Sequence, residues 1–376
     1  MPLVPDRACK LPKRQFRLVG AAVRLVGVAV LVGCTSPLQV VTGITLGNGG
    51  SAGQAGTGGV AGFGGAYATA PPSCKVAEFT IPSSGSNPNS ITRGPDGAVW
   101  FTEWAGDRVG RITPTGTIME FANPVAQSGA VDITAGSDGN LWISEWGFAF
   151  NHDTTITRVT PKGDFTRFHI TPGCSPAGIT TGPDGKLWYV ETANQSIGSM
   201  AVNGNGAFTE FPLPACETQP YGITVGPDGN LWFTYCGIGR ITTAGEITVF
   251  PFPSPNTNAA GIAAGPDGNL WFTESQTDSA GNASYGIGRI TPDGTYTEFP
   301  LPEADSEVWS IVGGPDGNLW FTDTGRNEIG RISPDGTVAR CPIPTKDSYV
   351  EGIALGADGN LWFVEWSGNN LGRMAP

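Results

Sequence analysis

The sequence predicts an all-β fold, a single seven-bladed β-propeller of four-stranded antiparallel blades. Three observations support this prediction: a ten-residue phrase that recurs seven times, a hairpin turn inside each copy, and two chain ends that complete one another. The copies resemble GPDGNLWFTE, are spaced 39 to 49 residues apart, and begin at Gly94, Gly136, Gly182, Gly226, Gly265, Gly314 and Gly356. A period of about 40 to 50 residues is typical of propeller blades.

The first 34 residues have the layout of a secretory signal peptide. A basic stretch precedes an apolar run, which ends in Leu-Val-Gly and Cys34. This ending resembles the lipobox of bacterial lipoproteins, and the resemblance implies cleavage before Cys34 and lipid on its thiol. Arg24 interrupts the apolar run, and a spanning helix needs about 20 apolar residues. We therefore expect an exported protein, lipid-anchored to the cell envelope, at the outer membrane if the source has two membranes.

Residues 35–73 predict a disordered tether. Eleven glycines and no charged residue lie between positions 43 and 70. Such a segment cannot bury enough apolar surface to fold. The propeller is then expected to occupy residues 74–376.

Each repeat predicts a meander of four strands. In the fourth copy the expected strands are residues 223–226, 231–235, 238–242 and 247–250. Asp-Gly between the first two strands is a strong hairpin signal, because both residues tolerate the positive φ that a tight turn requires. A second glycine turn separates the third and fourth strands. A proline-containing phrase then leads to the next blade.

The two ends of the chain are expected to close the ring. The last copy stops after its third strand, at residues 371–374, and lacks a fourth. Residues 78–82 resemble the fourth-strand phrase at residues 298–302, yet they precede the first blade. The N-terminal strand should therefore complete blade seven, which removes the exposed edge strands of an open array.

Two recurring residue types are interpreted as packing elements. The tryptophan of each phrase is expected in the core between blades. These residues are Trp100, Trp142, Trp188, Trp232, Trp271, Trp320 and Trp362. The arginine of the third strand is expected to be structural as well, at Arg111, Arg158, Arg240, Arg289, Arg331 and Arg373.

The cysteines predict one disulfide near blade four. Export permits disulfides. Cys174 and Cys216 lie in the connections that enter blades three and four, and Cys236 ends the second strand of blade four. We expect a pair drawn from these three, with Cys216 as the common member. Without a Cys-x-x-Cys motif and with only two histidines, the sequence does not favour a zinc site.

One face of the disc is expected to hold the ligand site, because second strands end there and first strands begin there. The second strand ends in an acid in six blades and in tyrosine in the other: Glu103, Glu145, Glu191, Tyr235, Glu274, Asp323 and Glu365. Carboxylates repeated in nearly every blade are typical of a hydrogen-bonding device of the blade. The alternative is ligand contact, for which Glu103, Glu145 and the nearby Glu307 are the candidates.

Tryptophans that occur in only some of the repeats indicate where a ligand could bind. Trp104, Trp146 and Trp366 follow the acid in blades one, two and seven, which are consecutive in a closed ring. Trp309, at the start of blade six, extends this arc. Large aromatic residues beside carboxylates suit sugars, stacked rings or cations. The alternative is that each tryptophan folds back onto its own blade.

Several phrases, including GIAAGPDGNLWFTE, IGRITPDGTYTEFPLP and QPYGITVGPDGNLWF, resemble the virginiamycin B lyases, also called streptogramin lyases. The resemblance covers residues 74–376. It implies a seven-bladed propeller that, with magnesium, linearises cyclic depsipeptide antibiotics by elimination. It also implies functional histidines at the start of first strands, together with glutamates and a tyrosine in Pro-Tyr-Gly-Ile.

Only some of the family's functional residues are present at the matching positions of this sequence. Tyr221 lies in Pro-Tyr-Gly-Ile and matches the tyrosine, and Glu307 matches one glutamate. The histidine places hold no histidine; they are occupied by Asn89, Val131, Ala177, Tyr221, Ala260, Trp309 and Glu351.

An elimination needs a base for the α-proton and an acid for the leaving group. The candidates are Tyr221, Glu351 with Glu365 close by, and His152 in the long loop of blade two. His169 lies in an outer strand and is set aside.

Charge argues against nucleic acid as a partner. Beyond residue 34 the chain has 15 basic and 32 acidic residues, a formal net charge of −17, whereas nucleic-acid binding needs a basic surface. We predict a monomeric cell-envelope lipoprotein whose funnel binds a small-molecule, glycan or peptide ligand. The alternatives are a magnesium-dependent lyase acting on cyclic depsipeptides, another carboxylate-based propeller enzyme, and an interaction scaffold.

Overall fold

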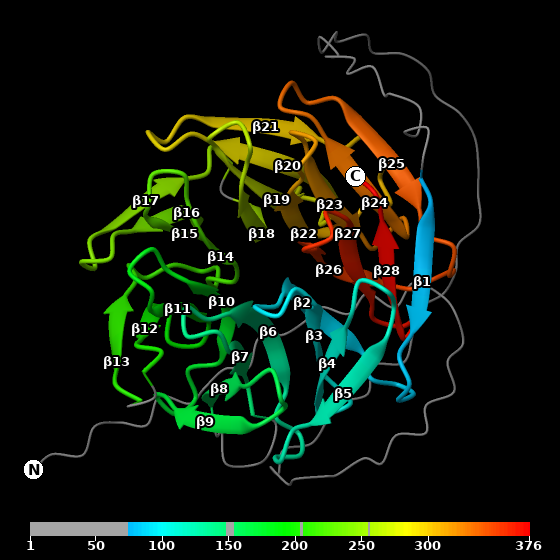
Figure 1. Cartoon of the computed structure of the whole chain (residues 1–376). Helices are drawn as coiled ribbons and strands as arrows, with labels where there is room; N and C mark the ends of the chain where they lie inside the picture. The colour runs from blue at the N-terminus through cyan, green and yellow to red at the C-terminus, as the bar shows by residue number, and fades with distance from the viewer. Residues whose placement is uncertain (1–73, 148–153, 204–205, 255) are drawn as a thin grey trace, which may run out of the picture. The chain divides into compact units, whose positions relative to one another are not determined.

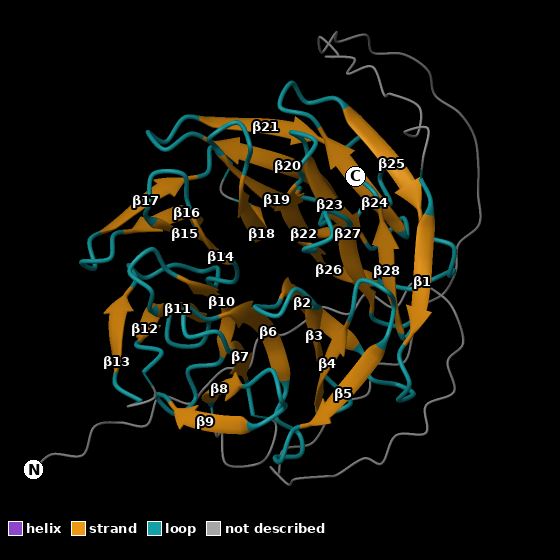
Figure 2. Cartoon of the chain, in the orientation of Figure 1, coloured by secondary structure: helices purple, strands orange, loops and turns teal. Residues whose placement is uncertain are grey.

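The computed structural model describes residues 74–147, 154–203, 206–254 and 256–376. These residues form 28 strands in seven four-stranded antiparallel sheets, arranged around a ring (Figures 1 and 2). The predicted fold class is therefore confirmed. Within the described part of the chain, no helix is long and apolar enough to span a membrane.

The blades are numbered from the first complete meander. Blade one comprises β2 (Pro88–Arg93), β3 (Val99–Glu103), β4 (Arg108–Ile112) and β5 (Ile118–Ala122). Blade two comprises β6 (Ala130–Ala135), β7 (Leu141–Glu145), β8 (Thr155–Val159) and β9 (Phe165–His169). Blade three comprises β10 (Pro176–Thr181), β11 (Leu187–Glu191), β12 (Ser196–Met200) and β13 (Phe208–Pro212). Blade four comprises β14 (Ile223–Val225), β15 (Leu231–Tyr235), β16 (Gly237–Ile241) and β17 (Ile247–Pro251).

The remaining blades have the same order, and the last takes its outer strand from the N-terminal side. Blade five comprises β18 (Thr257–Ala264), β19 (Leu270–Thr277), β20 (Ala283–Ile290) and β21 (Tyr296–Pro300). Blade six comprises β22 (Val308–Gly313), β23 (Leu319–Asp323), β24 (Glu328–Ile332) and β25 (Val338–Pro342). Blade seven comprises β26 (Val350–Leu355), β27 (Leu361–Glu365), β28 (Asn370–Met374) and β1 (Val76–Thr80).

The repeated phrase forms the same local unit in every blade. In blade one the indole N–H of Trp100 donates to Asp96 Oδ1 at 3.0 Å, while Gly97 takes the positive φ of 77° that the turn requires. The other six phrase tryptophans donate equivalent bonds to their turn aspartates. All seven tryptophans are at most 1% exposed, and the guanidinium of Arg111 lies 6.0 Å from the centroid of the Trp100 ring. The interpretation of these tryptophans as core residues is confirmed.

The core is divided among the interfaces between blades. Each pair of successive blades encloses one cluster of buried apolar side chains, including the pair formed by blades seven and one. In that closing interface Phe101 of β3 packs in one cluster with Trp362 of β27. The ring is thus closed by packing as well as by strand pairing.

The predicted closure by the N-terminal strand is confirmed. Strand β1 pairs antiparallel with β28, with Val76 opposite Met374 and Thr80 opposite Asn370. Figure 1 shows β1, in blue, beside β28, in red, in blade seven. The strand begins two residues before the predicted residues 78–82, because Val76 and Ala77 also pair with the last strand.

Candidate functional site

Three aromatic residues gather in the loops of blades seven and one. The rings of Trp104 and Trp366 lie with their centroids 5.4 Å apart and their planes tilted by 44°. The backbone N–H of Trp366 donates to the carbonyl of Tyr349 at 3.0 Å, and Tyr349 is 53% exposed. We call Tyr349, Trp366 and Trp104 the aromatic rim. The sequence predicted that Trp104 and Trp366 would lie together, and the ring contact brings them together.

Asn87 holds the two tryptophan loops in register. Its carbonyl accepts the backbone N–H of Trp104 at 3.2 Å, and its side-chain Nδ2 donates to the carbonyl of Trp366 at 3.3 Å. A single residue before β2 therefore ties the loop of blade one to the loop of blade seven. Hydrogen bonds to the backbone of both tryptophans therefore fix how the two loops lie relative to each other.

The loops that come after the second strands of blades seven and one also bind the loops that enter the next blades. Asn369 Oδ1 accepts both the backbone N–H and the hydroxyl of Ser86 at 2.9 Å. Asp107 accepts the backbone N–H groups of Gln127 at 2.7 Å and Ser128 at 3.1 Å. These contacts join blade seven to blade one and blade one to blade two on the face that carries the aromatic rim.

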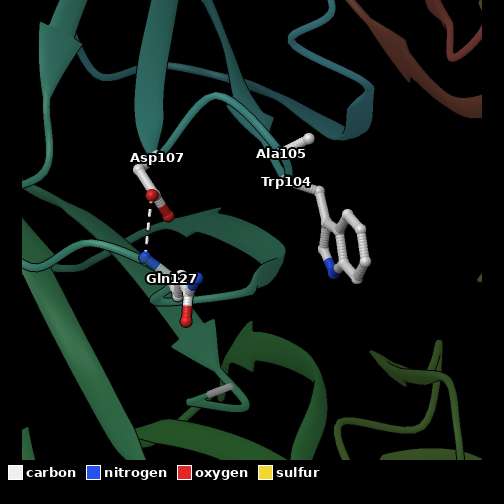
Figure 3. Close-up of a pocket in the computed structure, with 4 residues that line it drawn as sticks. All are labelled: Trp104, Ala105, Asp107 and Gln127. Atoms are coloured by element: carbon white, nitrogen blue, oxygen red, sulfur yellow. Dashed lines mark hydrogen bonds between the residues drawn. The ribbon is translucent and has the colours of Figure 1, made fainter. Parts of the chain in front are cut away.

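A shallow hollow of about 250 Å³ lies next to Trp104. It is lined by Trp104, Ala105, Asp107 and Gln127 (Figure 3). The first three come from the loop after β3, and Gln127 comes from the loop that enters blade two. The hollow thus combines an indole, a carboxylate and an amide side chain.

Tyr349 was not predicted from the sequence as a site residue. It adopts a left-handed backbone with φ of 51°, and the equivalent residues before the first strands of blades one and two are Asn87 with φ of 48° and Gly129 with φ of 62°. Asn and Gly tolerate this region, whereas a bulky residue there is uncommon. The signal that could have revealed it is an aromatic residue in the Ser-x-Val phrase, where blades one and two have Asn and Gly after the serine.

The other tryptophan candidates also lie in half-buried positions of this face. Trp146 follows β7, and its backbone N–H donates to the carbonyl of Gly129 at 3.1 Å. Trp309 lies in β22 beside Glu307. Burial raises the pKa of Glu307, and a hydrogen bond from the side chain of Trp309 partly offsets this effect.

The carboxyls that end the second strands lie beneath the surface. Glu103, Glu145 and Glu365 are all 0% exposed. Contact of Glu103 and Glu145 with a ligand stays a prediction, because both side chains are covered in this structure. The structure instead favours the alternative, a hydrogen-bonding device of the blade, for Glu145.

Glu145 has a complete set of partners. Its oxygens accept from Asn123 Nδ2, Thr155 Oγ1 and Thr157 Oγ1, each at 2.6 Å, and from Arg167 Nε at 3.3 Å. Arg167 comes from β9, the outer strand of the same blade. A cation and three donors together compensate the buried charge.

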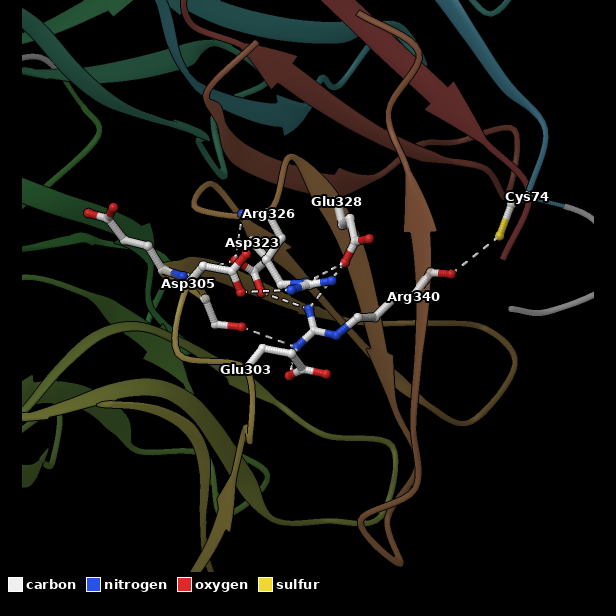
Figure 4. Close-up of polar contacts among 9 residues, drawn as sticks. Cys74, Glu303, Asp305, Asp323, Arg326, Glu328 and Arg340 are labelled. Carbon is white, nitrogen blue, oxygen red and sulfur yellow. Dashed lines mark hydrogen bonds and ion pairs between the residues drawn. The ribbon is translucent and has the colours of Figure 1, made fainter. Parts of the chain in front are cut away.

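Blade six uses the same arrangement with different residues. Arg340 of β25 donates to Asp323 Oδ2 at 2.6 Å and to Glu303 Oε2 at 2.9 Å, and lies 3.6 Å from Glu328 (Figure 4). Arg326 pairs with Asp305 at 2.7 Å on the exposed side. Asp323 is therefore bound to the middle residue of the outer strand, as Glu145 is.

Four other blades place a glutamate at that middle position of the outer strand. The second-strand acids that face it are Glu103, Glu191, Glu274 and Glu365, and their partners in the outer strands are Glu120, Glu210, Glu298 and Glu78. Burial raises the pKa of each second-strand acid, and the partner carboxylate raises it further. The pKa rises to about 8 for Glu103 and Glu274, and to about 7 for Glu191 and Glu365.

Comparison with known proteins assigns the fold to a family. The model of the Virginiamycin B lyase family matches residues 69–237 and 236–376. The chain belongs to the virginiamycin B lyase family. The virginiamycin B lyase of Nocardia farcinica is 30% identical over 135 residues, which cover 36% of this chain and 44% of that relative, so the match spans less than half of the relative's length.

Solved structures of the family superpose over the whole propeller. A streptogramin B lyase structure has a TM-score of 0.71 and 32% identity, and the match covers 80% of this chain and 97% of that one. The virginiamycin B lyase of Staphylococcus aureus gives the same TM-score and identity, with 99% of its chain covered. A catalytically inactive histidine-to-alanine variant of that enzyme, with quinupristin, matches equally well.

The candidate catalytic residues predicted from the sequence come from separate blades. Tyr221 precedes β14 in blade four and Glu351 lies in β26 of blade seven, and these blades are not neighbours. Glu365 is buried at the end of β27, with both oxygens lacking a hydrogen-bond partner. His152, like Cys34, lies outside the described residues, and His169 is exposed on the outer strand β9.

The described residues form no preformed cluster of metal-binding side chains. The family resemblance implies magnesium, which is held by oxygen ligands from carboxylates, carbonyls and water. No group of three or more His, Cys, Asp or Glu side chains suited to a metal occurs in the described part of the chain. We therefore derive no chemical step through a metal.

The cysteines form two disulfides among the described residues. Cys216 pairs with Cys236, as the sequence suggested, while Cys174 is buried and outside any disulfide. Cys174 is thus corrected as a candidate: it is a wholly buried residue in the core between blades two and three. Cys74 pairs with Cys341, a pair that was missed in the sequence, and this bond joins the chain just before β1 to the outer strand of blade six.

Proposed function

We propose that this protein is an exported, lipid-anchored member of the family that binds a small-molecule, glycan or peptide ligand on the aromatic rim. The observation that carries the proposal is the contact between Trp104 and Trp366 beside the hollow at Asp107 and Gln127. Half-buried indoles beside polar side chains offer stacking area and a few orienting hydrogen bonds, as small-molecule sites do. Tyr349, whose carbonyl accepts the backbone N–H of Trp366, is a further exposed aromatic residue of the same loops.

Substitution of the rim tests the binding proposal. Soluble peptidoglycan fragments and quinupristin are the probes, and binding is followed by calorimetry with the purified propeller. Trp104→Ala and Trp366→Ala should each weaken binding about tenfold or more, because a buried aromatic contact contributes about 1.4 kcal/mol or more. Met119→Ala, at an exposed residue of the outer strand β5, is the matched control and should bind normally. Equal affinity of the tryptophan variants and wild type would refute the proposal.

The family supports a second candidate function, elimination on a cyclic depsipeptide. The supporting observation is the family match together with Tyr221 in its Pro-Tyr-Gly-Ile phrase. Against it stands the absence of histidine from the family's histidine places, since a histidine-to-alanine variant of the Staphylococcus aureus relative is catalytically inactive. Incubation with quinupristin and magnesium, followed by mass spectrometry, tests it: we expect binding without the isomeric linear product.

The lipid anchor is tested separately. The proposal rests on the leader and Cys34 of the sequence. Metabolic labelling with palmitate should label the wild-type protein in the membrane fraction, while Cys34→Ser should remain unlabelled. Equal labelling of both proteins would contradict lipidation at this residue.

A further inference from the structure

The two tryptophans that contact each other come directly after two unusual carboxyls. Glu103 precedes Trp104, and Glu365 precedes Trp366. Both glutamates are 0% exposed, and neither oxygen of either side chain has a hydrogen-bond partner. Among the buried carboxyls of the described residues, these are the two with both oxygens unpartnered. A buried charge without compensation is costly, so such groups favour the neutral form.

Each of the two carboxyls faces a second carboxyl from the outer strand of its blade. Glu120 of β5 faces Glu103, and Glu78 of β1 faces Glu365. Arg108 of β4 is the cation that faces Glu103, and it opposes the effect of Glu120. The other groups that face Glu365 are the uncharged side chains of Asn370 and Ser348, which lower its pKa and oppose the effect of Glu78.

The loops that carry the tryptophans lie directly over these carboxyls. A Cβ atom at Gly106 would lie 2.8 Å from Glu103 Oε2, and a Cβ atom at Gly368 would lie 2.8 Å from Glu365 Oε2. Only glycine fits this close approach without displacing the carboxyl. Water cannot hydrate either carboxylate unless its loop lifts, and a lifted loop carries its tryptophan with it.

We propose that the aromatic rim is a pH-responsive site, closed while each of the two carboxyl pairs holds a proton and opened when that proton is lost. In the closed form the pairs Glu103–Glu120 and Glu365–Glu78 each carry one negative charge, and Trp104 stays in contact with Trp366. Loss of the proton leaves two carboxylates side by side in each buried pair. Their repulsion and their need for water lift the loops and separate the indoles. The proposal rests on the binding function proposed above, because the pH change would control ligand binding at the aromatic rim.

The electrostatics of the two pairs set the pH range. Burial, followed by the neighbouring carboxylate, raises the pKa of Glu103 to about 8 and that of Glu365 to about 7. The rim is therefore closed in mildly acidic surroundings and opens as pH rises through this interval. Ligand affinity should fall as pH rises.

Circular dichroism in the near ultraviolet, on the ligand-free protein, tests the proposal. The difference spectrum between wild type and Trp104→Phe isolates the coupling of the two indoles. We expect this difference signal to fall by about half or more between about pH 6 and about pH 9. A signal that stays constant over this range would overturn the proposal.

Isosteric variants assign the transition to the two pairs. Glu103→Gln combined with Glu365→Gln removes both ionisable groups that precede the tryptophans, so the indole signal should persist over the whole range. The single variants, which also serve if the double variant does not fold, should each leave one transition, at the pH of the remaining pair. An unaltered transition in the variants would refute the assignment.

This readout is independent of ligand. If the indole signal changes with pH as expected and no probe binds, the binding function fails while the switch stands. If a probe binds with the same affinity at about pH 6 and about pH 9 and the indole signal is constant, the switch fails while the binding function stands.

Discussion

Blades two and six differ from blades one and seven in one position of the outer strand. In blades two and six that position is Arg167 or Arg340, and the buried acid at the end of the second strand is held by a cation. In blades one and seven the position is Glu120 or Glu78, and the buried acid has no hydrogen-bond partner. The same repeated acid is therefore held by a cation in two blades and is a buried carboxyl without a compensating partner in two others.

The difference matters because of the residue that comes after the acid. In blades one and seven this residue is a tryptophan that belongs to the aromatic rim, whereas in blade six it is Thr324. Blade two has Trp146 after the fully bonded Glu145, so it is an internal control. The molecule thus places the two carboxyls whose oxygens both lack a hydrogen-bond partner beneath the two loops whose indoles touch.

Removing a cation should have the largest effect. Arg340→Met leaves the buried Asp323 and the neighbouring Glu303 without their common partner. Breaking one side of a buried pair costs about 3 to 5 kcal/mol, and we expect the free energy of unfolding to fall by that amount. Denaturant titration at neutral pH measures it. Arg326→Met, at a more exposed arginine, should cost about 1 kcal/mol or less, and equal losses for the two variants would contradict the comparison.

A pH profile of stability should show the next largest effect. The pKa values of Glu103, Glu191, Glu274 and Glu365 lie near 7 or 8 in the folded protein, above the usual value of 4.5. Between these limits the folded protein binds more protons than the unfolded chain, so the free energy of unfolding falls as pH rises from about 5 to about 8. Denaturant titrations across this range should show the fall, on the order of a few kcal/mol.

A matched variant sharpens this prediction. Glu103→Gln should flatten part of the pH profile, because the variant has no proton to lose at this position. Asp278→Asn, at a residue in an exposed turn of blade five, changes the same charge and should leave the slope intact. A profile that is flat in the wild type, or that is equally altered by both variants, would contradict the role of the buried pairs.

Replacing the outer-strand glutamate of blade one by the arginine that blade six has there should change the free energy of unfolding less. Glu120 of blade one and Arg340 of blade six both lie opposite a glycine of the third strand, Gly110 and Gly330. Glu120→Arg should therefore give Glu103 a cation and raise the free energy of unfolding at about pH 8 by about 1 kcal/mol. This gain is smaller than that of a fully buried pair, because Arg108 already lies near Glu103. Thermal unfolding at two pH values measures the gain, and a loss at the higher pH would count against it.

Removing one of several partners should have the smallest effect. Asn123→Ala deletes one bond to Glu145, which keeps its bonds to Thr155, Thr157 and Arg167. We expect a loss of about 1 kcal/mol, the usual net contribution of one hydrogen bond, in denaturant unfolding. A loss as large as that of Arg340→Met would show that the partners of Glu145 do not share its charge.

The fold could be predicted almost completely, because its determinants are local and repeated. The turn aspartate, the turn glycine and the buried tryptophan lie within five residues, so each copy of the phrase specifies the same hairpin. The ring closure could also be inferred from the sequence, since the strand phrase at the N-terminal side matched the one that blade seven lacks. The contact of Trp104 with Trp366 was then expected from the circular order of the blades.

The properties of the site depend on pairs that are distant in sequence, and these were missed. Glu365 and Glu78 are separated by most of the propeller, and nothing near either residue distinguishes Glu365 from the fully bonded Glu145. The Cys74–Cys341 disulfide was missed for the same reason, although the predicted closure already placed the start of β1 beside the outer strand of blade six. Tyr349 was overlooked because the aromatic residue after Ser348 differs from Asn87 and Gly129 only when the three blades are aligned at the start of their first strands.

The protonation of Glu103 and Glu365 can be followed residue by residue. Nuclear magnetic resonance of ¹³C-labelled glutamate carboxyls, with signals assigned by Glu103→Gln and Glu365→Gln, tracks each group as pH is raised. We expect midpoints of about 8 for Glu103 and about 7 for Glu365. Midpoints near the usual value of 4.5 would show that both groups are ionised in the folded protein at neutral pH, and would contradict the account.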